Sequence, residues 1–144
     1  MKQYERKNGG TQQMGTVRAH LHLDGAAILI ASVIGYALAG GSWWLFLLLL
    51  LLPDLFMLGY LGGPKTGSIV YNAGHTLLWP LLLLTLSLVI GEIELALAGA
   101  GPSFGFLHGG LIWAAHIGMD RTVGYGYKYP TDFKDTDIGR ASAE

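Results

Sequence analysis

The sequence has 144 residues, of which 51% are hydrophobic and 13% are charged. Soluble domains carry about 25% charged residues, so this deficit indicates a membrane protein. The formal net charge of −1 gives no basic field for nucleic acid, which is not an expected partner. The absence of cysteine excludes disulfides, thiol catalysis and thiolate metal sites, and leaves His, Asp, Glu and Asn as candidate metal ligands.

Four apolar segments follow one another along the chain, at residues 21–40, 43–61, 68–90 and 103–120. As a helix, each is long enough to cross a hydrocarbon core of about 30 Å. The connections are short, so neighbouring helices should be antiparallel. We therefore expect an all-α fold, a four-helix transmembrane bundle at 21–123. A polar, mobile segment at 1–20 precedes it, and an aromatic and polar cytoplasmic tail at 124–144 follows it.

The basic residues predict the orientation of this bundle. All nine fall on one side of the four-span arrangement, namely Lys2, Arg6, Lys7, Arg18, Lys65, Arg121, Lys128, Lys134 and Arg140. Lys and Arg beside spans stay on the cytoplasmic side of the membrane. Both termini are therefore expected in the cytoplasm, and the protein is expected as a multi-pass protein of the inner membrane, in contact with membrane lipids.

A cleaved signal peptide is the alternative interpretation of the first segment, because Ala37 and Ala39 form a small-residue site of the A-x-A kind. Its charged leader would be about twenty residues, which is long for such a peptide. A second apolar run follows immediately. These two features favour a membrane span.

Ionisable side chains interrupt the apolar segments, although a charge at membrane depth is costly and usually faces a protein interior or water. Asp54 precedes Pro64 by ten residues and His75 follows it by eleven. On antiparallel helices these two side chains lie at nearly the same depth, about 10 Å inside the cytoplasmic boundary. His116 is expected at about the same depth on the fourth segment, and Asp120, four residues on, shares its helical face.

This pattern predicts a metal site formed by Asp54, His75 and His116, because imidazole and carboxylate ligands suit zinc, manganese or iron. Asp120 is the expected catalytic residue, which would act as a fourth ligand or would orient His116. The alternative is a polar network that fixes helix packing and binds no ligand.

Three further polar residues, Asp24, Asn72 and Arg121, complete the expected pocket. Asp24 precedes Gly25 and is expected as a helix N-cap, whereas Asn72 should hydrogen-bond to another helix. Arg121 should snorkel to the boundary or pair with Asp120. The tyrosines of "GYGYKYP" are expected among the lipid headgroups. Alternatively, they form a recognition loop in which nearby Lys and Arg side chains, Lys128 among them, bind a lipid phosphate.

The stretches "LPDLFMLGYLGGPKTGSIVYNAGHTLLWP" and "LIWAAHIGMDRTVGYGYKYPTDFKDT" resemble a bacterial integral membrane family, the domain-of-unknown-function 4260 family, over about residues 21–139. The resemblance implies a small four-helix membrane protein with no established activity. The family pattern has an acidic residue before Gly in the first span, matched by Asp24. It ends in "DTHLG", where this chain has "DTDIG" with Asp137. "LLPDLF" and "GHTLLWP" also resemble membrane-bound metal-dependent hydrolases, although the Arg that usually follows their histidine is absent.

Three functions remain open at this point, and only the first is enzymatic. The first is a metal-dependent hydrolase that acts on a lipid-linked or amphipathic substrate at the cytoplasmic face, using a water activated by the metal. The second is a small proton-coupled transporter or channel, which would work as a homo-oligomer because four helices enclose little volume. The third is a noncatalytic membrane interaction protein in which the polar cluster is structural.

Overall fold

The computed structural model describes residues 2–98 and 104–140, and the helices lie within residues 2–98 and 104–122. In chain order the elements are α1 (Lys2–Leu38), α2 (Trp43–Leu50), η1 (Leu52–Gly62), α3 (Pro64–Gly74), α4 (Leu78–Ala98), α5 (Phe104–Thr122), β1 (Asp135–Thr136) and β2 (Gly139–Arg140). The two short strands pair in antiparallel fashion. The expected all-α fold is confirmed.

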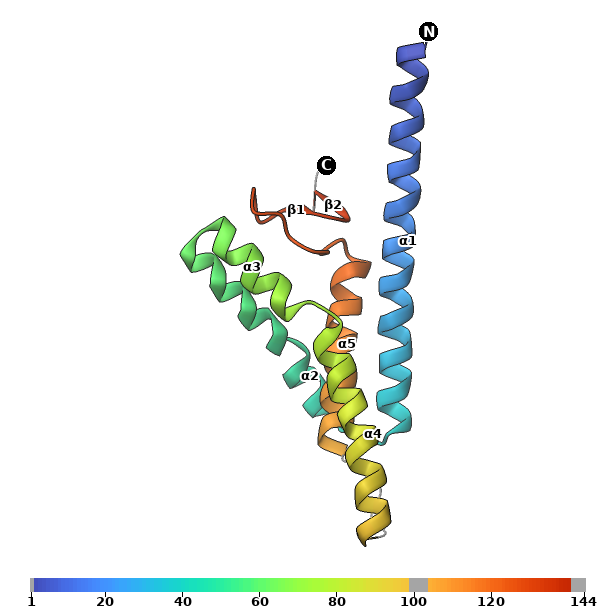
Figure 1. Cartoon of the computed structure of the whole chain (residues 1–144), viewed down its shortest axis with the longest axis vertical. Helices are drawn as coiled ribbons and strands as arrows, with labels where there is room; N and C mark the ends of the chain where they lie inside the picture. Colours follow the sequence, from blue (N-terminus) through green and yellow to red (C-terminus); the bar gives the residue numbers. More distant parts are fainter. Residues whose placement is uncertain (1, 99–103, 141–144) are drawn as a thin grey trace.

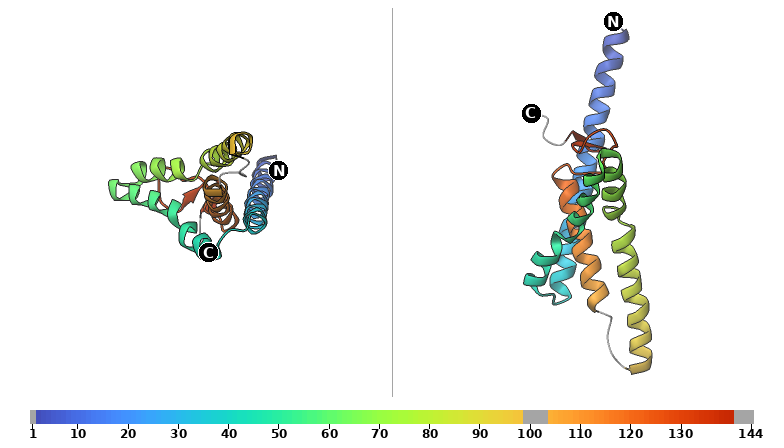
Figure 2. Two further views of the ribbon diagram at one scale, coloured as in Figure 1. Left: turned by 90° about the horizontal axis from the view of Figure 1, so that it is seen from below. Right: turned by 90° about the vertical axis from the view of Figure 1, so that its left-hand side faces the viewer.

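The central helix is α5. It packs against α1 on one side and α4 on another, as Figure 1 and the end-on view in Figure 2 show. A buried apolar cluster of Tyr36, Phe46, Ile112 and Ala115 joins α1, α2 and α5. After α2 the chain continues into η1 and returns through α3, and this hairpin slants away from α4 and α5 (Figure 1).

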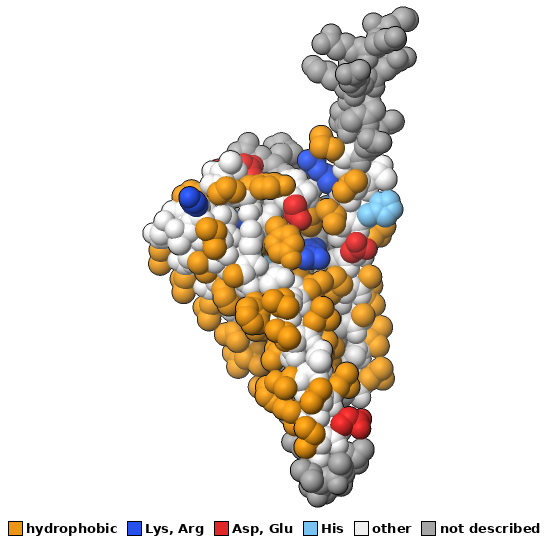
Figure 3. Space-filling model, in the orientation of Figure 1, with side chains coloured by type: hydrophobic (Ala, Val, Ile, Leu, Met, Phe, Trp, Pro, Cys, Tyr) orange, Lys and Arg blue, Asp and Glu red, His pale blue; other side chains and the backbone are white. Residues whose placement is uncertain are grey.

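Three helical stretches are long and apolar enough to cross a membrane: Met14–Leu38, Trp43–Gly62 and Pro64–Ile93. Hydrophobic side chains cover most of the face shown in Figure 3, and its Lys and Arg side chains lie toward the upper end. The fourth predicted span corresponds to α5, whose His108, His116, Asp120 and Arg121 make it more polar. This polarity is compatible with its place between the other helices. The side of the membrane on which the termini lie stays a prediction.

Both central spans are present, and neither is one continuous α-helix. The second changes at Leu51 from α2 into the 3-10 helix η1. Pro53 lies at the start of η1 and has no N–H to continue the α-helical pattern. The third span is interrupted at residues 75–77. Pro80 lies in the first turn of α4, where its missing N–H costs no hydrogen bond, so a new helix begins there.

Close packing between α1 and α5 depends on glycine. A β-carbon placed on Gly118 of α5 would lie 2.6 Å from the backbone nitrogen of Leu29 and 2.8 Å from the carbonyl oxygen of Gly25. Both of those atoms belong to the backbone of α1 and cannot rotate away. The backbones of the two helices therefore approach closely beside the polar end of α5, as small residues allow in membrane helix pairs.

Gly118→Ala is therefore expected to force α1 and α5 apart and to lower the free energy of unfolding by about 1–3 kcal/mol, the usual cost of overpacking. The control is Gly105→Ala on the same helix, where a β-carbon meets nothing within 4 Å. This control should be neutral or slightly stabilising, because alanine favours helix over glycine by about 0.5–1 kcal/mol. Thermal unfolding of both variants in detergent checks the prediction, and equal midpoints would contradict it.

Candidate metal centre

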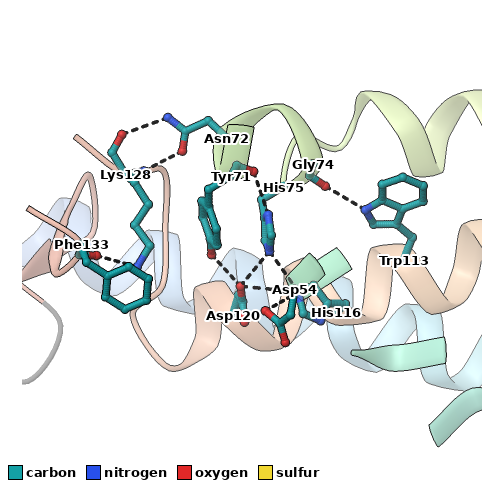
Figure 4. Close-up of polar contacts among 10 residues, drawn as sticks. All are labelled: Asp54, Tyr71, Asn72, Gly74, His75, Trp113, His116, Asp120, Lys128 and Phe133. Atoms are coloured by element: carbon teal, nitrogen blue, oxygen red, sulfur yellow. Dashed lines mark hydrogen bonds and ion pairs between the residues drawn. The ribbon is translucent and has the colours of Figure 1, made fainter. Parts of the chain in front are cut away.

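Four side chains from three parts of the fold meet inside the bundle, as Figure 4 shows. Asp54 comes from η1, His75 from the break after α3, and His116 and Asp120 from α5. One ligand atom of each lies within 4.8 Å of the corresponding atom of every other. The structure thus brings together the three predicted metal ligands and the predicted catalytic residue.

The closest approach in this cluster joins the two imidazoles, with 3.1 Å between Nε2 of His75 and Nε2 of His116. Asp120 Oδ2 lies 3.5 Å from the first of these nitrogens and 3.7 Å from the second. Asp54 Oδ1 lies 3.7 Å from Nε2 of His116. His75, His116 and Asp120 are buried, whereas the Asp54 side chain is 33% exposed. Solvent or a ligand can therefore reach the cluster at Asp54, whereas the other three side chains are shielded.

The break after α3 determines which nitrogen of His75 faces the cluster. Nδ1 lies 2.8 Å from the carbonyl oxygen of Tyr71, and the His75 ring stacks on the Tyr71 ring with centroids 3.6 Å apart. A carbonyl only accepts hydrogen bonds, so Nδ1 is the protonated nitrogen. The neutral ring therefore presents the lone pair of Nε2 to the cluster. A backbone carbonyl on the second nitrogen is a common partner of metal-binding histidines.

The spacing of the four donor atoms agrees with metal coordination. A tetrahedral ion with bonds of about 2.0–2.2 Å places its ligand atoms roughly 3.3–3.6 Å apart. Four of the six separations, at 3.1, 3.5, 3.7 and 3.7 Å, lie close to that range, and the two that join Asp54 to His75 and to Asp120 are within 4.8 Å. Two imidazole nitrogens and two carboxylate oxygens form a donor set that suits zinc, manganese or iron.

His116 differs from His75 in its outer partner. Its Nδ1 is buried and has no hydrogen-bond partner among the described residues. Asp120 contacts Nε2 of this ring, the nitrogen that faces the cluster, and not Nδ1. Asp120 thus lies beside the ligand atoms and does not bond to Nδ1 of His116. Of its two predicted roles, a fourth ligand or a residue that orients His116, this position agrees better with the first.

Tyr71 is a member of the site that the sequence analysis missed. Its hydroxyl donates a 2.7 Å hydrogen bond to Oδ2 of Asp120, and its side chain is fully buried. This bond fixes the carboxylate that faces both histidines. The signal in the sequence was the spacing, because Tyr71 lies four residues before His75 and so shares its side of α3.

The segment after α5 covers the cluster through Asn72. The Asn72 amide donates to the carbonyl oxygen of Lys128 at 2.9 Å, and the Lys128 backbone N–H donates to the amide oxygen of Asn72 at 2.7 Å. The expected partner of Asn72, another membrane helix, is therefore wrong. Asn72 is too polar to be left unpaired there, and the tail satisfies both of its polar atoms.

Lys128 is buried, with 3% of its surface exposed, so it is not available to a lipid phosphate in this arrangement. Its ammonium donates to the carbonyl oxygen of Phe133 at 2.9 Å and lies 4.1 Å from the Phe133 ring centroid. The rings of Tyr125 and Tyr71 lie 4.7 and 5.1 Å away. Burial lowers the pKa of Lys128, and the charge of Asp120 acts in the opposite direction.

Asp24 and Arg121 lie outside the four-residue cluster. Asp24 is exposed and lies inside α1, which begins at Lys2, so its interpretation as an N-cap is wrong because no free helix terminus exists there. The guanidinium of Arg121 lies over the Tyr127 ring, 5.4 Å from its centroid. His108, two turns from His116, hydrogen-bonds to the carbonyl oxygen of Ala39.

The fold and the cluster together define a class, namely a helical protein with three stretches able to cross a membrane and a mostly buried group of histidines and aspartates that could hold a metal ion. The chain belongs to the family described as a domain of unknown function, DUF4260, whose model matches residues 18–141. The matched range contains the whole cluster together with Tyr71, Asn72 and Lys128. No curated protein and no solved structure matches the chain.

Loss of the Asn72 contacts should release the tail. In Asn72→Ala the backbone N–H of Lys128 loses its acceptor, so amide hydrogen exchange in residues 124–140 should become faster while exchange in α1 stays unchanged. Thr76→Ala is the matched control, because the hydroxyl of Thr76 accepts a hydrogen bond from the backbone N–H of Leu78, two residues away, and bonds to no residue in the described part of the tail. Mass spectrometry measures the rate of amide exchange in each variant. Equal rates for residues 124–140 in Asn72→Ala and Thr76→Ala would show that Asn72 does not hold the tail.

Proposed function

We propose that this chain is a membrane-embedded, metal-dependent hydrolase that acts on a lipid-linked or amphipathic substrate. The observation that carries the proposal is the convergence of two imidazole nitrogens and two carboxylates, from three separate elements, within 4.8 Å. Packing alone does not require four ionisable groups at one point, because each is costly to bury without compensation. The likeness of "LLPDLF" and "GHTLLWP" to membrane-bound metal-dependent hydrolases supports the same reading.

In this proposal Asp54, His75 and His116 hold a divalent ion. Such an ion supplies a nucleophile at neutral pH by lowering the pKa of a bound water. Asp120 accepts the proton that the water loses, and Tyr71 fixes the orientation of the Asp120 carboxylate through the hydrogen bond to Oδ2. Asp54 is the partly exposed member of the set, so the substrate reaches the centre on its side.

The contacts favour this reading over a path for protons or solutes through the bundle. On the side of the cluster away from the tail, Tyr36, Phe46, Ile112 and Ala115 form a buried apolar core. His108 in that region is engaged with a backbone carbonyl and with the Tyr36 ring. The polar groups thus gather at one end of α5. Measurement of the metal content distinguishes a metal centre from a cluster that is purely structural.

Elemental analysis of the detergent-purified protein should find about one divalent ion per chain, since a preformed set of ligands retains its metal through purification. Asp54→Asn and His75→Ala should each lose most of it. Asp24→Asn and His108→Ala are matched controls that change an aspartate and a histidine outside the cluster, and they should keep the metal. Near-zero metal in the wild type, even after incubation with zinc, manganese or iron, would end the metal proposal.

Hydrolysis can be detected without knowing the substrate, because one oxygen atom of water ends in a product. Proteoliposomes made from a total membrane lipid extract and incubated in ¹⁸O-labelled water should accumulate ¹⁸O-labelled lipid products, detected by mass spectrometry. A chelator should abolish the labelling. Asp120→Asn should slow it by about 10²–10⁴-fold, the usual contribution of a general base.

The metal content of Asp120→Asn separates the two roles open to this residue. If Asp120 is only a proton acceptor, Asp120→Asn should keep the bound metal. If Asp120 is a fourth ligand, Asp120→Asn should lose most of it. Asp24→Asn should label products at the wild-type rate. Full metal occupancy with no labelled product in any lipid fraction would contradict hydrolysis of a lipid.

A further inference from the structure

Two apolar recesses lie next to the cluster, between the apolar helices. The larger, of about 400 Å³, lies against η1, α3 and α5, and its wall includes Phe56 and Val70. The smaller, of about 210 Å³, lies between α2, α4 and α5. Leu52, Pro53 and Trp113 line both. The recesses therefore meet where the η1–α3 hairpin slants away from α4 and α5 (Figure 1).

The shared wall of the recesses is next to the cluster on each element. Pro53 immediately precedes Asp54, and Trp113 precedes His116 by three residues, which is about one helical turn. The indole N–H of Trp113 donates to the carbonyl oxygen of Gly74 at 2.9 Å, and Gly74 is the residue before His75. Figure 4 shows this contact beside the cluster. The apolar space thus begins within a turn of three of the four cluster residues.

The tail covers another side of the cluster. The pairing of Asn72 with the Lys128 backbone holds this segment over α3, and the Lys128 ammonium packs between Phe133 and Tyr71. The accessible member, Asp54, belongs to η1, the same helix whose residues line both recesses. A ligand that reaches Asp54 along η1 therefore comes from the bilayer, without displacing the tail.

We propose that the two recesses hold a hydrocarbon chain of a membrane lipid, whose headgroup then lies at Asp54. Only the placement of the headgroup at Asp54 rests on the proposed function. The site for the hydrocarbon chain is inferred from the two recesses alone. Their lining is apolar throughout, and the larger volume falls within the range of about 300–1,000 Å³ usual for ligand sites. The surrounding lipid is equally apolar, so the recesses fix the position of the chain and add little affinity.

The location of bound chains tests this directly. The protein is reconstituted in vesicles of phosphatidylethanolamine and phosphatidylglycerol that contain a phospholipid with a photoreactive diazirine in one acyl chain. After illumination and digestion, crosslinks should be enriched several-fold on residues 52–59 and on the peptide that contains Trp113. The reference is a set of leucines outside the recesses that are about as exposed or more exposed, Leu47, Leu48 and Leu88, so exposure alone would favour crosslinks on these residues.

Leu55→Trp should narrow the larger recess and lower this enrichment on residues 52–59. Leu55 is 57% exposed, so the larger side chain displaces no buried neighbour, and the thermal midpoint should not change. Leu48→Trp on α2 is the matched control and should keep the enrichment. Crosslinks that follow exposure evenly over all helices, or that are unaffected by Leu55→Trp, would overturn the proposal.

Metal analysis of the same samples separates this proposal from the proposed function. Enriched crosslinks in protein that holds no metal would support the chain site and overturn the hydrolase. Metal-loaded protein with evenly spread crosslinks would overturn the chain site and leave the metal centre standing.

Discussion

Asp54 and Asp120 bring two carboxylates to within 4.8 Å of each other among apolar helices. Like charges at that distance repel strongly in a medium of low dielectric constant, and even one such charge is costly to bury. This repulsion is relieved if one carboxyl group is protonated or if a positive charge lies between the two, and the lone pair of His75 faces the same point as the carboxylates. The two helix breaks serve this arrangement, because Pro53 begins the helix that carries Asp54, and the interruption after Gly74 turns His75 onto the carbonyl of Tyr71.

The sequence predicted the cluster because its geometry depends on fixed quantities. The helical rise per residue and the short turn at Pro64 determine the relative depth of Asp54 and His75, and a spacing of four places Asp120 beside His116. The convergence survives the helix breaks, because the ligand atoms of Asp54 and His75 still lie within 4.8 Å of each other. A bend at Pro53 is expected from the sequence, because proline has no N–H for the helical pattern. The break after Gly74 was not foreseen, although Pro80 carried the signal. Asp24 was misplaced because the start of an apolar run was taken for the start of a helix.

Contacts between distant segments were beyond the reach of the sequence. Lys128 lies 56 residues from Asn72, and nothing in the composition of the tail predicts that its backbone bonds to that amide. The sequence offered Lys128 as one of the side chains that could bind a lipid phosphate, yet three aromatic rings and a carbonyl surround its ammonium. Likewise, α5 is the most polar of the predicted spans because helices, and not lipid, surround much of it. Hydropathy measures what a helix is made of and does not show what surrounds it.

The pairing of Asn72 with Lys128 also closes a large loop of the chain. Two hydrogen bonds join the end of α3 to the segment after α5, across 56 residues that include the whole of α4 and α5. Because His75 follows Asn72 by three residues and Asp120 precedes Lys128 by eight, both ends of this loop lie beside the cluster. Any opening of the loop at this point therefore costs two hydrogen bonds within a few residues of the ligand atoms.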